Sequence, residues 1–128
     1  LDIAINREPN VGQYYNSKGS ILARIGRFDE SFAAFAKAIE LEPNNALFLE
    51  SLGFAYVDLG NKLNEDATYL DNKAYAKAKV EIDAAYKNAL PYFEKAYELE
   101  PDNESFKHSL RSLYYRLGMN DKYEALAD

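Results

Sequence analysis

Apolar side chains recur along the chain at the three- and four-residue intervals of a single helix face. One run leads from Leu52, at intervals of four, three, four, four and three residues, through Tyr56, Leu59, Leu63, Ala67 and Leu70. A second run, from Tyr75 to Ala96, keeps the same rhythm. Amphipathic α-helices show this spacing, whereas strands alternate apolar and polar positions. The pattern therefore predicts an all-α fold.

A longer period lies over the helical one. After 34 residues, the series Pro9, Gly12, Gly19 and Gly26 returns as Pro43, Ala46, Gly53 and Gly60. A fixed period of this length is the sequence signature of a helical repeat array. The prolines end the helices that precede them. Side chains able to cap the next helix follow, namely Asn10, Asn44–Asn45 and Asp102–Asn103.

The third copy of the pattern comes late. Residues 38–45 return as residues 96–103, a shift of 58 residues instead of 34, which places an insertion near residues 61–88 in the second repeat. Because both apolar runs continue across this insertion, we expect a long helical hairpin with its turn near Asp71–Lys73. We expect a kink in its second helix at Pro91. A partly disordered loop is the alternative.

The period, with small residues at helix crossings such as Gly19, Gly53 and Ala38, resembles the tetratricopeptide repeat (TPR) family. The resemblance implies an antiparallel helix-pair solenoid, a TPR-like α-α superhelix, in which each unit packs on its neighbours. It implies a single array over residues 1–128: the end of a preceding repeat at 1–11, a complete repeat at 12–45, the interrupted repeat at 46–103, and a terminal, truncated or capping repeat at 104–128. Since the array begins and ends within repeats, we expect a piece of a longer protein.

The last unit departs from this pattern. Arg111 and Tyr123 stand where the family has small residues at the crossing of the two helices. Two interpretations fit. The unit caps the array with a polar outer face, or the register slips after Gly118.

Composition narrows the range of functions. The formal net charge is −6, with acidic and basic residues interspersed, which disfavours a nucleic-acid partner. No run of 18 apolar residues is present, so we expect no membrane insertion of this segment. The absence of cysteine excludes disulfides and thiolate metal sites. The compartment stays open between the cytoplasm and, by a resemblance to exported bacterial repeat proteins, the bacterial periplasm or cell envelope.

Side chains able to carry out catalysis are scarce. His108 is the only histidine, and no glycine-rich phosphate loop is present. Acidic pairs such as Glu65–Asp66 lack the alternation of a calcium-binding loop. We therefore expect no enzyme activity, no cofactor and no metal, and we interpret His108 as a groove-lining side chain.

The resemblance to tetratricopeptide repeats also implies a concave groove, made by the first helix of each unit, that binds a peptide or a partner protein. Transferred by register, the partner-binding groove residues are Gln13, Asn16, Ser20, Arg24, Leu47, Glu50, Phe54, Asp58, Ser105, His108, Ser112, Tyr115 and Arg116. One subfamily grips terminal carboxylates with Lys, Asn and Arg at set groove positions. Serines and a single asparagine occupy those positions here, so that clamp is absent.

Two functions fit the sequence. The first is a non-catalytic protein–protein interaction module that binds its partner in the groove, favoured if Phe54 and Tyr115 are exposed. The second is a structural spacer or self-association element that acts through the long hairpin, favoured if Tyr69, Leu70 and Tyr75 are exposed. A homo-oligomer is compatible with the sequence. The partner itself is not specified by any motif.

Overall fold

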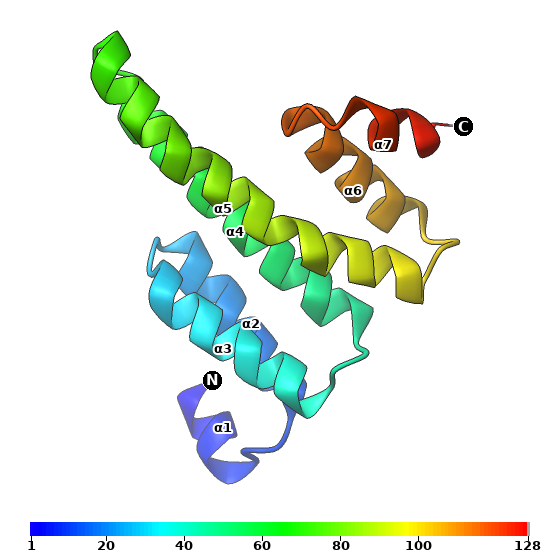
Figure 1. Cartoon of the computed structure of the whole chain (residues 1–128). Coiled ribbons are helices and arrows are strands. Elements are labelled where there is room, and N and C mark those ends of the chain that lie inside the picture. The colour runs from blue at the N-terminus through cyan, green and yellow to red at the C-terminus, as the bar shows by residue number, and fades with distance from the viewer. Residues whose placement is uncertain (128) are drawn as a thin grey trace.

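The computed structural model describes residues 1–127, which form seven α-helices and no β-strand. The helices are α1 (Asp2–Arg7), α2 (Gly12–Arg24), α3 (Phe28–Leu41), α4 (Ala46–Ala67), α5 (Asn72–Leu99), α6 (Glu104–Arg116) and α7 (Asn120–Ala125). Helix α2 packs on α3, α4 on α5 and α6 on α7, and these antiparallel pairs stack one after another (Figure 1). The prediction of an all-α helix-pair solenoid is confirmed.

Asparagine side chains begin two of the helices. Asn45 and Asn103 each accept a hydrogen bond from the backbone N–H three residues later, at 3.2 and 3.1 Å, and so satisfy a donor that the first turn leaves free. The prediction that Asn10 caps α2 is wrong. Val11 occupies the cap position and makes no side-chain bond, because Asn10 stands in the register of Asn44, one residue before the cap.

Small residues allow the paired helices to approach closely. A Cβ atom at Gly19 would lie 2.8 Å from the ring of Phe35, and one at Gly53 would lie 2.6 Å from the ring of Phe93. Both rings are buried. The fully buried Ser31 hydroxyl donates a hydrogen bond of 2.6 Å to the backbone oxygen of Gly19. At each of these crossing points, an aromatic ring from one helix packs against the backbone of a glycine in the other helix.

The helices α4 and α5 are the longest, with 22 and 28 residues, and one end of the pair projects beyond its neighbours (Figure 1). Along α4 the buried positions Ala46, Gly53, Gly60 and Ala67 are all small and lie seven residues apart. A seven-residue repeat of this kind is the packing period of a coiled coil. In residues 61–88, α4 and α5 therefore go on packing against each other beyond the rest of the array. We call this projecting helix pair the arm.

The turn between α4 and α5 comes slightly earlier than the sequence suggests. It spans residues 68–71, whereas the predicted turn centred on Asp71–Lys73. The side chain of Asp71 accepts a hydrogen bond of 2.9 Å from the N–H of Ala74, and this cap starts α5 at once. Pro91 lies on an exposed face inside α5, and the helix runs through it and bends (Figure 1).

The pairs α2–α3 and α6–α7 share one tight turn. Gly26 and Gly118 have φ of 84° and 71°, a left-handed conformation that suits glycine. After each glycine, the next backbone N–H returns to the carbonyl five residues earlier, at 2.8 Å for Arg27 and 2.9 Å for Met119. The last pair therefore keeps the register of the first, and no slip occurs after Gly118.

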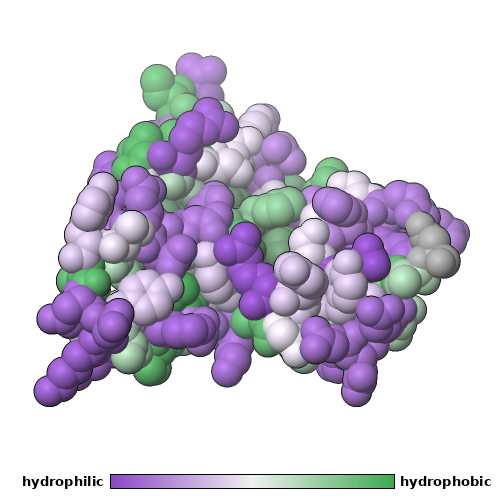
Figure 2. Space-filling model, turned by 90° about the horizontal axis from the view of Figure 1, so that it is seen from above, coloured by the Kyte–Doolittle hydropathy of each residue, from purple (hydrophilic) through white to green (hydrophobic). Residues whose placement is uncertain are grey.

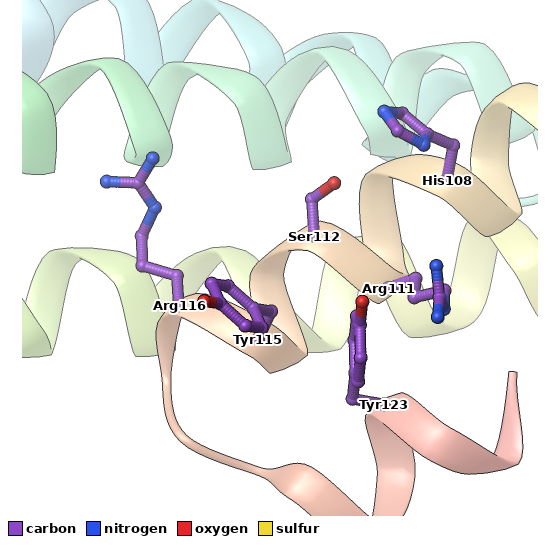
Figure 3. A pocket seen from close by; sticks show the side chains of 6 residues that line it. All are labelled: His108, Arg111, Ser112, Tyr115, Arg116 and Tyr123. Carbon is purple, nitrogen blue, oxygen red and sulfur yellow. The ribbon is translucent and has the colours of Figure 1, made fainter. Parts of the chain in front are cut away.

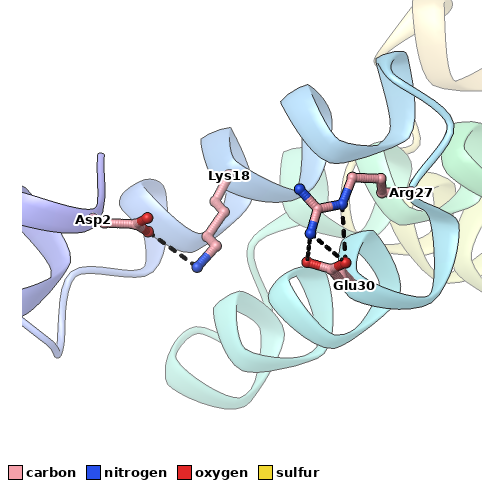
Figure 4. Close-up of polar contacts among 4 residues, drawn as sticks. All are labelled: Asp2, Lys18, Arg27 and Glu30. Carbon is pink, nitrogen blue, oxygen red and sulfur yellow. Dashed lines mark hydrogen bonds and ion pairs between the residues drawn. The ribbon is translucent and has the colours of Figure 1, made fainter.

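Two exposed ion pairs lie at the N-terminal end of the stack (Figure 4). Lys18 on α2 reaches Asp2 on α1 at 3.1 Å. Arg27 contacts Glu30 at the start of α3 at 2.6 Å. All four side chains are well exposed, so each pair contributes little to stability.

Hydrophilic residues cover most of the face seen from above, where hydrophobic residues form separate patches (Figure 2). Among residues 1–127, no helix combines the length and apolar character needed to cross a lipid bilayer.

Candidate partner-binding groove

Phe54 lies at the centre of the surface that α2, α4 and α6 build. Its ring remains 43% exposed although it follows two buried positions of α4. The ring packs at a steep angle, 70°, against the ring of Phe93 of α5, with the ring centroids 5.1 Å apart. Two hollows share this side chain. Phe54 is therefore packed against Phe93 and still accessible from solvent.

The first hollow lies between α2 and α4 and has a volume of about 280 Å³. It contains four of the predicted groove residues, namely Ser20, Arg24, Phe54 and Asp58. Burial raises the pKa of Asp58 above its ordinary value, because partial removal from water disfavours the charged carboxylate. Among the described residues, neither Arg24 nor Asp58 forms an ion pair.

The second hollow lies between α4 and α6 and has a volume of about 250 Å³. Its walls are largely apolar, with Phe54, Val57, Phe93 and Leu113. The polar side chains come from α6, where His108, Ser112 and Arg116 follow one another at intervals of four residues, the spacing of one helix face. We name these three residues the α6 ridge.

A third hollow, of about 430 Å³, lies on the other side of the α6 ridge, toward α7 (Figure 3). Arg111 and Tyr123 line it together with Tyr115 and the ridge. The guanidinium of Arg111 sits 4.0 Å from the centroid of the Tyr123 ring, and the Tyr115 ring is 5.4 Å from that of Tyr123. The register did not assign Arg111 and Tyr123 to the groove. The sequence signal that points to these two residues is their size, since the family has small residues at both positions of the helix crossing.

Comparisons with known proteins decide the family. A family model described as "TPR repeat" matches residues 19–60, and one described as "Tetratricopeptide repeat" matches residues 84–103. The chain contains tetratricopeptide repeats in both of these segments. Repeats of this family generally mediate protein–protein interactions. No curated protein matches the chain.

Among solved structures, this tetratricopeptide repeat chain is similar to a monomeric mutant of IFIT1 with Gppp-AAAA. The TM-score is 0.73, and 20% of the residues are identical over 88% of this chain. The match covers 24% of the IFIT1 chain, so the present chain spans about a quarter of that length. At this identity the likeness concerns the fold.

Several predicted groove residues of the tetratricopeptide repeat array lie outside all three hollows. Gln13 is exposed and donates to Ser17 at 3.1 Å. Leu47 and Ser105 are exposed. Asn16 is buried, and its side-chain oxygen has no partner within the described residues. The register thus indicates a helix face but does not tell which of its residues surround a cavity.

Glu50, another predicted groove residue, is half-buried on α4. One of its carboxylate oxygens is buried without a hydrogen-bond partner within the described residues. Burial raises the pKa of Glu50, and a hydrogen bond from Ser109 offsets part of that rise. A carboxylate held in this way is costly for the folded chain when it is ionised.

Arg116, predicted to contact a partner, is already engaged inside the tetratricopeptide repeat array. Its guanidinium donates to the hydroxyl of Tyr86 at 2.9 Å and to the side-chain oxygen of Asn61 at 3.3 Å. Tyr86 in turn donates to Asn61 at 2.6 Å. These three side chains tie α6 to both helices of the arm. Sequence reasoning missed this use because the partners of Arg116 are 30 and 55 residues away.

Proposed function

We propose that the chain is a non-catalytic interaction module that binds an extended peptide of a partner protein across α2, α4 and α6, with Phe54 as its anchor. The position of Phe54 carries this proposal. Phe54 is 43% exposed, its ring packs against that of Phe93, and the side chain is shared by the two hollows that flank α4. Aromatic anchors that are rigid before binding contribute a large share of interface energy.

The charges around the first hollow suggest what a bound peptide would present there. Asp58 is partly desolvated and has no ion-pair partner among the described residues. Asp58 remains exposed, so a basic side chain of the peptide would be able to pair with its carboxylate. We therefore propose a peptide with an apolar residue over Phe54 and a Lys or Arg on its α2 side.

The formal net charge of −6 supports a protein partner rather than a nucleic acid. Binding a phosphate backbone relies on several basic side chains that release counterions. The first two hollows together contain two arginines, Arg24 and Arg116, and Arg116 is engaged with Asn61 and Tyr86. The likeness to the IFIT1 structure with Gppp-AAAA, at 20% identity, concerns the fold and does not indicate a nucleic-acid ligand for this chain.

An array of random-sequence peptides, followed by titration of the strongest binder, tests the proposal. Phe54→Ala should weaken binding at least about tenfold, since truncating an interface anchor costs about 2 kcal/mol or more. Val80→Ala is the matched control, because Val80 is an exposed apolar side chain of α5 outside the hollows. Equal binding by the wild type and Phe54→Ala, or no binder in the array, would contradict the groove.

The second candidate function is self-association through the arm. Tyr69 at its tip is 94% exposed, and Leu70 beside it is exposed as well. Tyr75 contributes less than the sequence suggests, because it is half-buried and its hydroxyl donates to Asn64 at 3.1 Å. Sedimentation velocity of the wild type and of Tyr69→Ala/Leu70→Ala separates the two functions. A concentration-dependent dimer that only the tip variant loses would support the arm.

A further inference from the structure

The hollow between α6 and α7 gathers positive charge in a chain that is acidic as a whole. Arg111 and Arg116 line it, together with His108 and the rings of Tyr115 and Tyr123, and none of its lining residues is acidic (Figure 3). The formal net charge of the chain is −6. A cationic hollow on such a background is a local feature of α6 and α7.

Arg111 is the cation in this hollow that is free to bind. Its guanidinium stacks on Tyr123 at 4.0 Å, which fixes the plane of the group. Its Nε–H is buried and finds no acceptor, and no described residue forms a hydrogen bond or ion pair with the remaining donors. Arg116, in contrast, already donates to Tyr86 and Asn61. The hollow thus offers one pre-oriented guanidinium with unused donors.

The contrast with the first helix pair shows that this cation is specific to the last one. In the first pair, Gly19 and Ser31 occupy the positions of Arg111 and Tyr123 and make a buried hydrogen bond of 2.6 Å. The last pair replaces that contact with a guanidinium stacked on a ring. A hollow of about 430 Å³ lies beside this contact.

Tyr115 adds an apolar surface beside the cation. Its ring is 68% exposed and lies 5.4 Å from the Tyr123 ring, tilted by 52°. Such a ring offers a flat face to an apolar or aromatic side chain. The hollow therefore presents one charged and one apolar contact next to each other.

We propose that this hollow binds an acidic side chain, Asp or Glu, within a peptide segment of a partner protein. The carboxylate accepts paired hydrogen bonds from Arg111, and a neighbouring apolar residue of the peptide packs on Tyr115. A single free guanidinium matches a singly charged carboxylate better than a chain of phosphates, which recruits several cations. This acidic subsite rests on the proposed groove, since both use the α6 ridge.

Titration followed by two-dimensional NMR of the whole chain tests the subsite. The probe is an acetylated, amidated pentapeptide of sequence Gly-Glu-Phe-Glu-Gly, which has no terminal carboxylate. Its twin carries Gln in place of both Glu, and inorganic phosphate serves as a third ligand. We expect the acidic peptide to shift the amide signals around Arg111 and Tyr123, and the twin to bind about tenfold more weakly or not at all.

Variants separate the subsite from the Phe54 groove. Arg111→Gln should weaken the acidic peptide about tenfold, whereas Lys77→Gln, an exposed cation on the outer face of α5, should leave it unchanged. Because Arg111→Gln also removes the stack on Tyr123, Ser112→Glu is the second variant. It places a carboxylate into the hollow from an exposed helix position and should likewise weaken binding.

The possible outcomes decide between the two sites. Phe54→Ala should leave the shifts at Tyr123 intact, so failure of the groove would not hide the subsite. No shift up to roughly 10 mM acidic peptide would overturn the subsite. Equal binding of the Gln twin, or binding of phosphate alone at the same residues, would overturn it as well, the latter by showing a general anion site.

Discussion

Gly26 and Gly60 occupy the same place in successive repeats, and the chain uses them in opposite ways. Gly26 has φ of 84° and open space around it, and it ends α2. Gly60 lies inside α4, where a Cβ would meet the ring of Tyr86 at 2.5 Å. The glycine does not decide between a turn and a continuing helix. What decides is whether a ring packs on the glycine, as the ring of Tyr86 on α5 packs on Gly60.

The energetics of Gly60 explain why the helix continues. A glycine inside a helix costs about 1 kcal/mol relative to alanine. Here the bare backbone admits the ring of Tyr86, which is buried and hydrogen-bonded to Asn61. Burial of a large aromatic side chain contributes roughly 2 kcal/mol or more, so the contact outweighs the cost.

The sharpest test of this comparison is Gly60→Ala. At most helical sites this change stabilises by about 1 kcal/mol, but here the added methyl overlaps the Tyr86 ring. We expect a loss of about 1–3 kcal/mol in urea unfolding. In the double variant Gly60→Ala/Tyr86→Leu, the two losses should be clearly less than additive, because the methyl no longer meets a ring. A stabilised Gly60→Ala variant would show that the ring does not rest on Gly60.

Gly26 should respond through its backbone instead of its contacts. Gly26→Ala forces a side chain into the left-handed region and should cost about 1–2 kcal/mol, although no atom lies within 4 Å of the new Cβ. Gly26→Asn should cost less, since Asn tolerates this conformation. At the other glycine, Gly60→Asn should lower the free energy of unfolding at least as much as Gly60→Ala. If Asn and Ala rank alike at both glycines, the contrast between turn and contact is wrong.

The smallest expected effect concerns a charge that distinguishes α4 from α2. Glu50 and Asn16 share one repeat position, and Glu50 alone titrates. Burial raises the pKa of Glu50 in the folded chain. A carboxyl group with a raised folded pKa supports folding below its unfolded pKa, and this support is lost as the pH rises through the folded value. Glu50→Gln should therefore raise the melting temperature near about pH 7 and change it little near about pH 3.

Calorimetry at the two pH values measures this effect. The control is Glu65→Gln, which replaces an exposed glutamate on the same helix. A lower melting temperature for Glu50→Gln at neutral pH would mean that the ionised carboxylate, with its bond from Ser109, stabilises the fold.

The sequence predicts the periodic part of this molecule well, because helix packing imposes small residues at regular intervals. Gly19, Gly53 and Ala38 are at crossings as expected. Local chemistry that depends on a single position is harder to predict. Asn10 has a side chain able to cap a helix, but it lies one residue before the cap position of α2. Asp71, which the sequence places within a turn, caps α5.

For the candidate site, the sequence predicts in outline which residues share a surface. Register places Phe54 and the α6 ridge on one surface, and in the structure they line one hollow together. Register carries no information about contacts between distant segments, so it did not reveal that Arg116 is engaged with Tyr86. It also did not reveal the stack of Arg111 on Tyr123, since a contact between two atypical residues has no counterpart in the regular repeats.

The projecting arm has a consequence for how the chain unfolds. The folded chain exposes 8032 Å², whereas a compact monomer of this length exposes about 6,900 Å². Less surface is therefore released to solvent on unfolding than in a compact domain. Both the denaturant dependence of the unfolding free energy and the heat-capacity change scale with that released surface. The chain should unfold over a broader range of urea concentration than a compact protein of equal length and midpoint.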